Sequence, residues 1–218
     1  MNTNKISDWL RAPVLPVVVV QTEAQALAIA EGLIAGGIHQ IEITLRTDAA
    51  LAAIAAIARE YPDLALSAGS VLEPDQFDRA QQAGASLFIS PGLTEKLANH
   101  AQKNDLAWVP GVATASEAMR ACELGFHTLK FFPAMAAGGP KALAGISAPL
   151  ATPSFIPTGG VTLSNLPEWK AIDSVVACGG TWLSASLDEF GATYAAISKG
   201  VAQRAEQALN RWHDQLSA

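Results

Sequence analysis

The chain carries little charge and few cysteines. Asp, Glu, Lys and Arg make up 16% of its 218 residues, against about a quarter in an average soluble domain. The net charge is −6 and the sequence has no basic run, so nucleic-acid binding through phosphate neutralisation is not expected. The two cysteines, Cys122 and Cys178, lack the spacing of a disulfide scaffold or a zinc knuckle. We expect both thiols to be reduced, in a cytoplasmic protein.

Membrane and metal signals are also missing. Residues 1–10 contain no apolar signal core, and Val14–Val20 is too short to span a bilayer. Four histidines are scattered over predicted loops and helix ends: His39, His100, His127 and His213. None has a ligand-like spacing to another metal-binding residue, so we interpret them as surface residues. The sequence therefore predicts no membrane segment, no metal and no other cofactor.

What the chain does have is a large apolar fraction arranged in alternating elements. Half of its residues are hydrophobic, which allows a large core. The predicted strands are Val14–Val20, Gln40–Leu45, Leu64–Ala68, Leu87–Ser90, Ala107–Pro110, Thr128–Phe132, Phe155–Thr158 and Val175–Cys178. The predicted helices are Asn4–Leu10, Glu23–Gly36, Ala49–Tyr61, Pro74–Ala83, Thr94–Lys103, Ser116–Leu124, Pro140–Ile146, Ser164–Lys170 and Tyr194–Leu216.

Strict alternation of strand and helix predicts a parallel sheet covered by helices. The strands are almost continuously apolar, as expected for burial on both faces. Eight such units are typical of a (β/α)8 TIM barrel, here preceded by a short N-terminal helix. An open doubly wound sheet is less favoured, because no Gly-x-Gly-x-x-Gly follows the first strand. No linker or charge block divides the chain, so residues 1–218 are predicted to form one domain.

Lys130 interrupts the apolar strand at 128–132. Lysine is rarely buried without compensation, and desolvation leaves part of an amine neutral and nucleophilic. Such an amine can form a Schiff base with a carbonyl substrate. The alternative is a lysine at a strand end whose ammonium reaches solvent while its stem stays buried.

Glu42 interrupts the second strand in the same way. Strand alternation directs Ile41, Ile43 and Leu45 toward the helices, and Glu42 and Arg46 toward the interior of a barrel. An interior carboxylate is costly unless it is paired. Glu42 is therefore either half of a structural ion pair, with Arg46 or Lys130, or a general acid/base beside an amine nucleophile.

Other polar and glycine residues follow the strands, where a barrel places its active site. Arg46 is suited to bind a substrate carboxylate bidentately, and Ser70 offers a hydroxyl to the same group or caps a helix. The Gly159-Gly160 pair and the Gly179–Thr181 segment end the last two predicted strands. Barrel enzymes often bind phosphate at these loops, so a phosphorylated small molecule is the expected ligand.

Together these segments resemble the 2-keto-3-deoxy-6-phosphogluconate (KDPG) and 4-hydroxy-2-oxoglutarate aldolase family. The matching segments, in family order, are 42–47, 68–72, 89–94, 109–112, 129–134, 157–160 and 179–183. The Glu-Ile-Thr-Leu-Arg and Lys-Phe-Phe-Pro-Ala segments are the most specific. The resemblance implies a homotrimeric class I aldolase of the Entner–Doudoroff pathway. Such an enzyme cleaves KDPG to pyruvate and glyceraldehyde 3-phosphate.

The resemblance also implies roles for individual residues. Lys130 forms the Schiff base and Glu42 transfers protons, while Arg46 and Ser70 bind the pyruvyl carboxylate. The family usually has Thr at the position of Ser70, and this difference keeps a hydroxyl.

The remaining implied roles concern the phosphate and the pocket wall. Gly159, Gly160 and Thr181 face the phosphate, and Pro91 and Phe132 line the pocket. The family usually has Ser at the position of Thr181. This second difference also keeps a hydroxyl, so both bear on affinity or specificity rather than on the reaction.

Three alternatives stay open. The first is an aldolase of the same group with another substrate. That substrate is either 4-hydroxy-2-oxoglutarate, which lacks the phosphate of KDPG, or the galactonate epimer of KDPG, which differs at one stereocentre. In a phosphosugar isomerase without a covalent step, Lys130 serves as an electrostatic clamp. A non-catalytic phosphate-binding barrel leaves the inward Glu42 and Lys130 unexplained.

Overall fold

A computed structural model describes residues 6, 9–185, 187–191 and 193–214. The strands in this part of the chain are β1 (Val14–Val18), β2 (Gln40–Thr44), β3 (Ala65–Gly69), β4 (Leu87–Ile89), β5 (Trp108–Val109), β6 (Gly111–Val112), β7 (Thr128–Phe131), β8 (Ser154–Pro157) and β9 (Cys178–Gly180). The α-helices are α2 (Glu23–Ala35), α3 (Ala50–Glu60), α4 (Pro74–Ala83), α5 (Glu95–Lys103), α6 (Ala115–Glu123), α7 (Gly139–Ser147), α8 (Leu166–Lys170) and α9 (Tyr194–His213), with a 3₁₀ helix, η1, at Leu187–Phe190.

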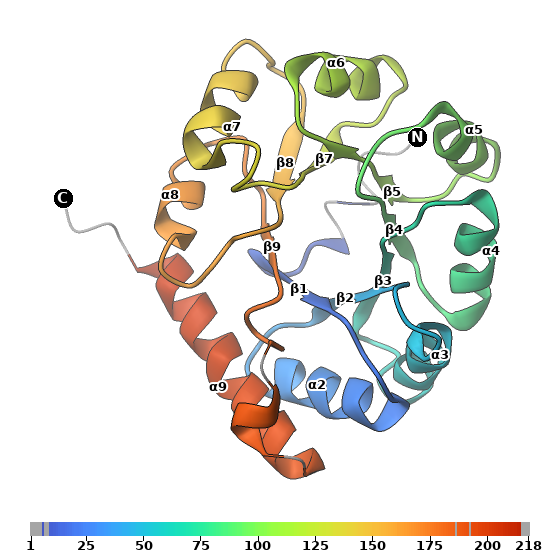
Figure 1. Ribbon diagram of the computed structural model, residues 1–218, viewed down its shortest axis with the longest axis vertical. Helices are drawn as coiled ribbons and strands as arrows, with labels where there is room; N and C mark the ends of the chain where they lie inside the picture. The colour runs from blue at the N-terminus through green and yellow to red at the C-terminus, as the bar shows by residue number, and fades with distance from the viewer. Residues whose placement is uncertain (1–5, 7–8, 186, 192, 215–218) are drawn as a thin grey trace.

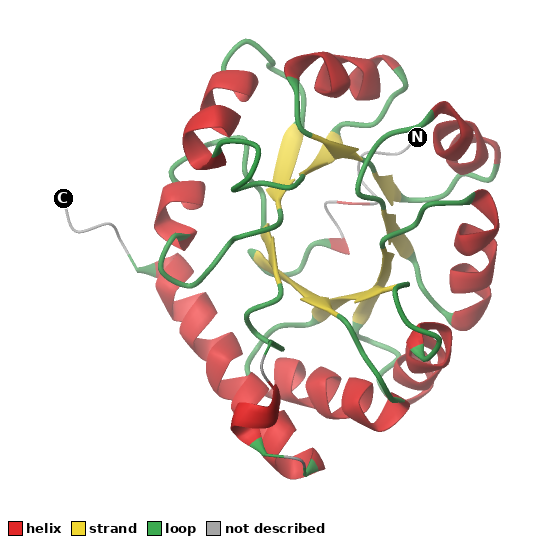
Figure 2. Cartoon of the chain, in the orientation of Figure 1, coloured by secondary structure: helices red, strands yellow, loops and turns green. Residues whose placement is uncertain are grey.

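The strands form a curled parallel sheet with helices around its outside (Figures 1 and 2). Six strands pair in the order β5-β4-β3-β2-β1-β9, and three more pair in the order β6-β7-β8. Single parallel bridges, Phe155 with Val175 and Thr158 with Gly179, connect the β8 side to the β9 side. The prediction of an α/β fold with parallel strands and outer helices is confirmed.

Two apolar clusters lie on opposite faces of the strands. The larger one fills the space between strands and helices and includes Ile41, Ile43 and Phe131. The smaller one is formed by alternate strand residues and the N-terminal segment: Ile6, Trp9, Leu15, Ala65, Leu87, Ile89, Val109, Ile156 and Ala177. The inner face therefore carries this apolar cluster together with buried polar side chains, among them Gln40 and Glu42 on β2 and Thr128 and Lys130 on β7.

Most predicted strands agree with the observed ones to within one or two residues at each end, and two differ by more. The fifth is divided at Pro110 into β5 and β6, because proline has no N–H to donate to a ladder. The Pro110 carbonyl still accepts a hydrogen bond from the Lys130 N–H at 2.9 Å. The eighth begins at Cys178 instead of Val175, which forms only an isolated bridge. Most of the predicted helix at 4–10 lies outside the described residues.

The helices begin where side chains cap them. Thr22 accepts a hydrogen bond from the Gln25 N–H at the start of α2, and Thr114 and Glu117 form a capping box at the start of α6. The last helix, α9, packs closely along α2. Within the described residues, no helix is long and apolar enough to cross a membrane.

Candidate active site

Lys130 and Glu42 meet on the inner face of the sheet. Lys130 lies in β7, in register with Gly111 of β6 and Ile156 of β8, and Glu42 lies at the centre of β2. The Lys130 Nζ donates to Glu42 Oε1 at 3.2 Å, and the two side chains are only 7% and 1% exposed. Of the two ion pairs that the sequence left open for Glu42, the structure forms the one with Lys130.

The other carboxylate oxygen, Glu42 Oε2, is buried without a hydrogen-bond partner among the described residues. A buried acceptor of this kind costs free energy until something donates to it. The Lys130–Glu42 pair therefore combines an amine with a carboxylate oxygen that can accept a proton or a hydrogen bond from a bound molecule.

Gly69 leaves space for the Glu42 side chain, a role that was not predicted from the sequence. Gly69 is the last residue of β3 and pairs with Thr44 on β2. A Cβ built on Gly69 would lie 2.0 Å from Glu42 Oε1. Any side chain here would displace the carboxylate. The sequence feature that could have predicted this role is a glycine at the end of the strand that follows the one with the inward-facing glutamate.

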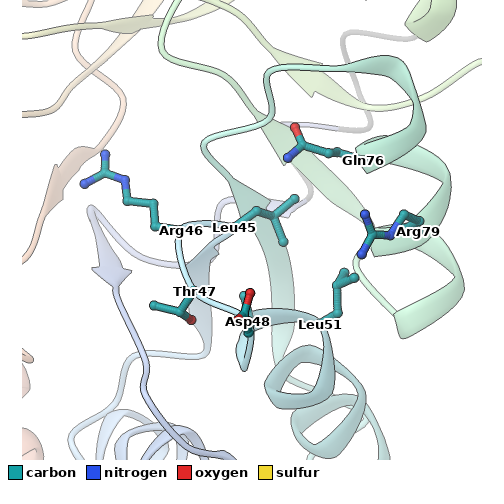
Figure 3. A pocket seen from close by; sticks show the side chains of 8 residues that line it. Leu45, Arg46, Thr47, Asp48, Leu51, Gln76 and Arg79 are labelled. Atoms are coloured by element: carbon teal, nitrogen blue, oxygen red, sulfur yellow. The ribbon is translucent and has the colours of Figure 1, made fainter.

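Arg46 and Ser70 meet at the rim above this pair. The Arg46 Nε donates to Ser70 Oγ at 3.0 Å, and Arg46 is exposed. Ser70 has a φ of 59°, a left-handed conformation that is uncommon for a residue other than glycine. Figure 3 shows Arg46 pointing away from Leu45, in the turn that follows β2.

A cavity of about 290 Å³ lies on the outer side of this rim. Its lining includes Leu45, Asp48 and Leu51 near the start of α3, and Gln76 and Arg79 from α4 (Figure 3). Neither Lys130 nor Glu42 lines it. This cavity is thus separate from the buried pair.

The other predicted pocket residues lie at the ends of neighbouring strands. The Phe132 ring centre is 5.4 Å from Lys130 Nζ, and a Cβ on Gly159 would lie 3.4 Å from that ring. Gly159 and Gly160 have φ values of 97° and 81°, which suit glycine. Pro91 is half-buried.

Thr181 is exposed directly after β9. The structure thus places it at the same ends of the strands as the Gly159-Gly160 turn, which the Thr158–Gly179 bridge joins to β9. Among the described residues no hydrogen bond links Thr181 to the Lys130–Glu42 pair, and its contact with a phosphate stays a prediction.

No group of three or more His, Cys, Asp and Glu side chains arranged for a metal ion occurs among the described residues. Cys122 and Cys178 are free thiols. Burial raises the pKa of the Cys178 thiol. The chemistry that the site offers is that of an amine, a carboxylate and hydrogen-bond donors.

Residues 6–198 match the family model described as KDPG and KHG aldolase. A relative named KHG/KDPG aldolase, from Escherichia coli strain K12, is 44% identical over 171 residues, which are 78% of this chain and 80% of the relative. The chain belongs to the KDPG and KHG aldolase family. The resemblance found in the sequence motifs is thereby confirmed.

Solved structures of KDPG aldolases share its fold. The enzyme of Zymomonas mobilis ZM4, solved with 3-phosphoglycerate, is 39% identical, with a TM-score of 0.84 and 94% of each chain covered. The enzyme of Legionella pneumophila is 37% identical, with a TM-score of 0.83, covering 89% of this chain and 95% of that one. It was solved with pyruvate captured as a covalent carbinolamine intermediate. Such an intermediate requires an amine nucleophile.

Proposed function

We propose that this KDPG/KHG-family chain is a class I aldolase that cleaves KDPG to pyruvate and glyceraldehyde 3-phosphate through a Schiff base on Lys130. The observation that carries the proposal is the buried Lys130–Glu42 pair, with Nζ and Oε1 3.2 Å apart. A structural ion pair would not need an unpartnered second carboxylate oxygen, whereas proton transfer to a substrate does.

The reaction proceeds from the amine. In its neutral form, the Lys130 Nζ attacks the C2 ketone to give a carbinolamine. The carbinolamine hydroxyl takes up a proton and leaves as water, which gives an iminium ion. Glu42 accepts the proton of the C4 hydroxyl, directly or through one water, and C4 becomes the aldehyde carbon of glyceraldehyde 3-phosphate. The electrons of the C3–C4 bond pass into the iminium, giving an enamine. C3 then takes a proton back from Glu42, and water hydrolyses the imine to release pyruvate and Lys130.

The rim residues bind the two charged ends of the substrate in this proposal. Arg46, held by Ser70, binds the pyruvyl carboxylate. The turn at Gly159 and Gly160, together with Thr181, binds the phosphate through backbone N–H groups and a hydroxyl.

Pro91 and Phe132 line the space between the two ends. The Phe132 ring stands 5.4 Å from the Lys130 amine, so it limits how a substrate can approach Nζ.

A second candidate substrate is 4-hydroxy-2-oxoglutarate, because the E. coli relative is named for both substrates. It presents the same keto acid and C4 hydroxyl to Lys130 and Glu42 but lacks the phosphate. Parallel kinetics with both substrates, and with the galactonate epimer of KDPG, establish the preference.

We also propose that residues 1–218 form a single domain, a closed (β/α)8 barrel. Because only Pro110 separates β5 from β6, the two count as one strand of the barrel, and the described residues then contain eight strands. The hydrogen bond from the Lys130 N–H to Pro110 and the bridges between β8 and the β9 side support closure. A homotrimer follows from the family resemblance, and two free thiols fit a cytoplasmic enzyme. Light scattering coupled to size exclusion tests the trimer.

Reductive trapping tests the covalent step. The protein is treated with pyruvate and borohydride, and the adduct is located by intact mass and peptide mapping. We expect one pyruvyl adduct on Lys130, lost in Lys130→Met and kept in Lys141→Met, which removes an exposed lysine of α7. An adduct on another lysine contradicts the role proposed for Lys130, and no adduct at all favours a non-covalent isomerase.

A further inference from the structure

The polar contacts between the segment that follows β9 and α9 centre on one side chain, Arg204. Its Nη1 donates to the backbone carbonyls of Trp182 (3.1 Å) and Ala185, and its Nη2 donates to the Glu189 carboxylate at 2.9 Å. The guanidinium carbon also lies 4.1 Å from the centre of the Phe190 ring. One arginine thus contacts four residues of the segment at 182–190.

The Arg204 contacts lead directly to the proposed phosphate loop. The Trp182 ring lies so close to the backbone of Gly180 that a Cβ there would be 1.7 Å from the ring. Thr181 stands between these two residues. Arg204 therefore holds the Trp182 carbonyl in place. The Trp182 ring in turn packs on the Gly180 backbone, next to Thr181, whose hydroxyl we assign to phosphate binding.

Phe190 of this segment also packs on Gly200 of α9, where a Cβ would lie 2.3 Å from its ring, but the packing is open beside Trp182. A cavity of about 630 Å³ beside it is lined by residues of the β8–α8 loop, Trp182, Arg204 and Arg211. The Trp182 Nε1 is buried without a partner among the described residues. With a cavity on one side, the hydrogen bonds of Arg204 are the specific polar contacts that set the position of the Trp182 carbonyl.

The helix that carries Arg204, α9, is itself held in place by close packing. The α9 helix packs against α2, where a Cβ on Gly32 would lie 2.3 Å from the Ser198 carbonyl. Arg204 is 22% exposed as a side chain, so part of its charge is shielded from water. It also lies beyond residues 6–198, the part matched by the family model.

We propose that Arg204 is a positioning residue that holds the Gly180–Thr181 backbone in place for the phosphate group of the substrate. This inference rests on the proposed function, because it assumes that the phosphate binds at this loop. It predicts that Arg204 matters for phosphate affinity and not for the chemistry at Lys130, which lies on β7.

The test measures the two ends of the substrate separately. Inorganic phosphate binding is measured by calorimetry, pyruvate binding by the concentration dependence of borohydride trapping, and KDPG cleavage by steady-state kinetics. The variants are Arg204→Gln and Arg204→Lys, with Arg211→Gln as a matched control. Arg211→Gln removes the same charge from the same helix, and no hydrogen bond joins Arg211 to residues 182–190 in the described chain.

For Arg204→Gln we expect KM for KDPG and Kd for phosphate to rise about tenfold, the effect of losing one charge-assisted hydrogen bond. We expect kcat and half-saturation by pyruvate to stay within about twofold. Arg204→Lys should fall between, because lysine reaches one carbonyl but lacks the planar fork. Arg211→Gln should match the wild type.

An unchanged phosphate Kd in folded Arg204→Gln overturns the proposal, and so does an equal loss of phosphate and pyruvate binding. If Arg204→Gln does not fold, Arg204→Lys decides by the same criteria. Absence of pyruvate trapping in the wild type would refute the proposed function instead, while calorimetry with phosphate still reports on Arg204.

Discussion

At the scale of the residue, the site is defined by two charges that the fold removes from water. Burying Lys130 and Glu42 costs desolvation free energy, and their mutual attraction offsets it only in part. A pair of well-packed apolar residues would often serve stability as well or better. The pair is therefore better explained by the proposed chemistry than by folding, and the unpartnered Glu42 Oε2 is the atom to which we assign the proton transfer.

Glu42→Gln tests the carboxylate directly. The amide keeps the size of the side chain but cannot accept the C4 hydroxyl proton, so we expect kcat for KDPG to fall by about 10² to 10⁴. Reductive trapping of pyruvate on Lys130 should persist. The control is Glu73→Gln, which changes an exposed carboxylate paired with Lys96. Thermal melts of all variants ensure that folded proteins are compared, and a Glu42→Gln enzyme with full activity would exclude the acid–base role.

The two charged residues were predictable from the sequence because each interrupts an apolar strand. Their direct contact was only one of several options, since Glu42 could equally have paired with Arg46. The roles of Gly69 and Ser70 were harder to predict from the sequence. The close approach of Glu42 to Gly69 depends on the register of β2 and β3, which the sequence does not give. Ser70 has a left-handed backbone conformation, and a serine in the sequence does not indicate one.

At the scale of the element, strands and helices followed hydrophobic periodicity closely, and the differences occur at breaks in the backbone ladder. Pro110 divides a strand that composition alone shows as continuous. The η1 turn at Leu187–Phe190 was not predicted, because contacts with a distant helix, including the stacking of Phe190 on Arg204, hold it rather than a local pattern. The close packing of α2 on α9 was equally invisible to a single-helix pattern.

A pair of glycine-to-alanine substitutions tests the packing of α2 on α9. Gly32→Ala would place a Cβ 2.3 Å from the Ser198 carbonyl and 2.9 Å from the Val201 Cβ. We expect the free energy of unfolding to fall by about 1–3 kcal/mol, as for other overpacked sites. Gly145→Ala, in α7, meets nothing within 4 Å and should be stabilising by about 0.5–1 kcal/mol from helix propensity. Urea unfolding measures both values, and equal effects of the two substitutions would contradict close α2–α9 packing.

At the scale of the whole molecule, the inner face of the sheet holds both apolar and polar side chains. Ile6 and Trp9 belong to its apolar cluster, while Gln40 precedes Glu42 on the inner face of β2. Gln40 donates to the Ala12 and Val14 carbonyls, whereas Glu42 pairs with Lys130 from the far side of the sheet. This arrangement follows from which strand positions hold polar residues, and so it was largely readable from the sequence once the barrel had been inferred.

The stability of the whole chain should depend on pH through the fully buried Cys178. Burial raises its pKa in the folded protein above the value of about 8.5 in an unfolded chain. Above that pH the unfolded chain releases the thiol proton while the folded chain retains it, so folding stability is complete below about pH 8.5 and falls as the pH rises. We expect the wild type to lose up to about 1.4 kcal/mol per pH unit more than Cys178→Ala between pH 9 and 10. Urea unfolding of both proteins at equal concentration gives the comparison, since other groups titrate alike in the two chains. Parallel pH curves would show that the thiol is not shielded from water as the structure places it.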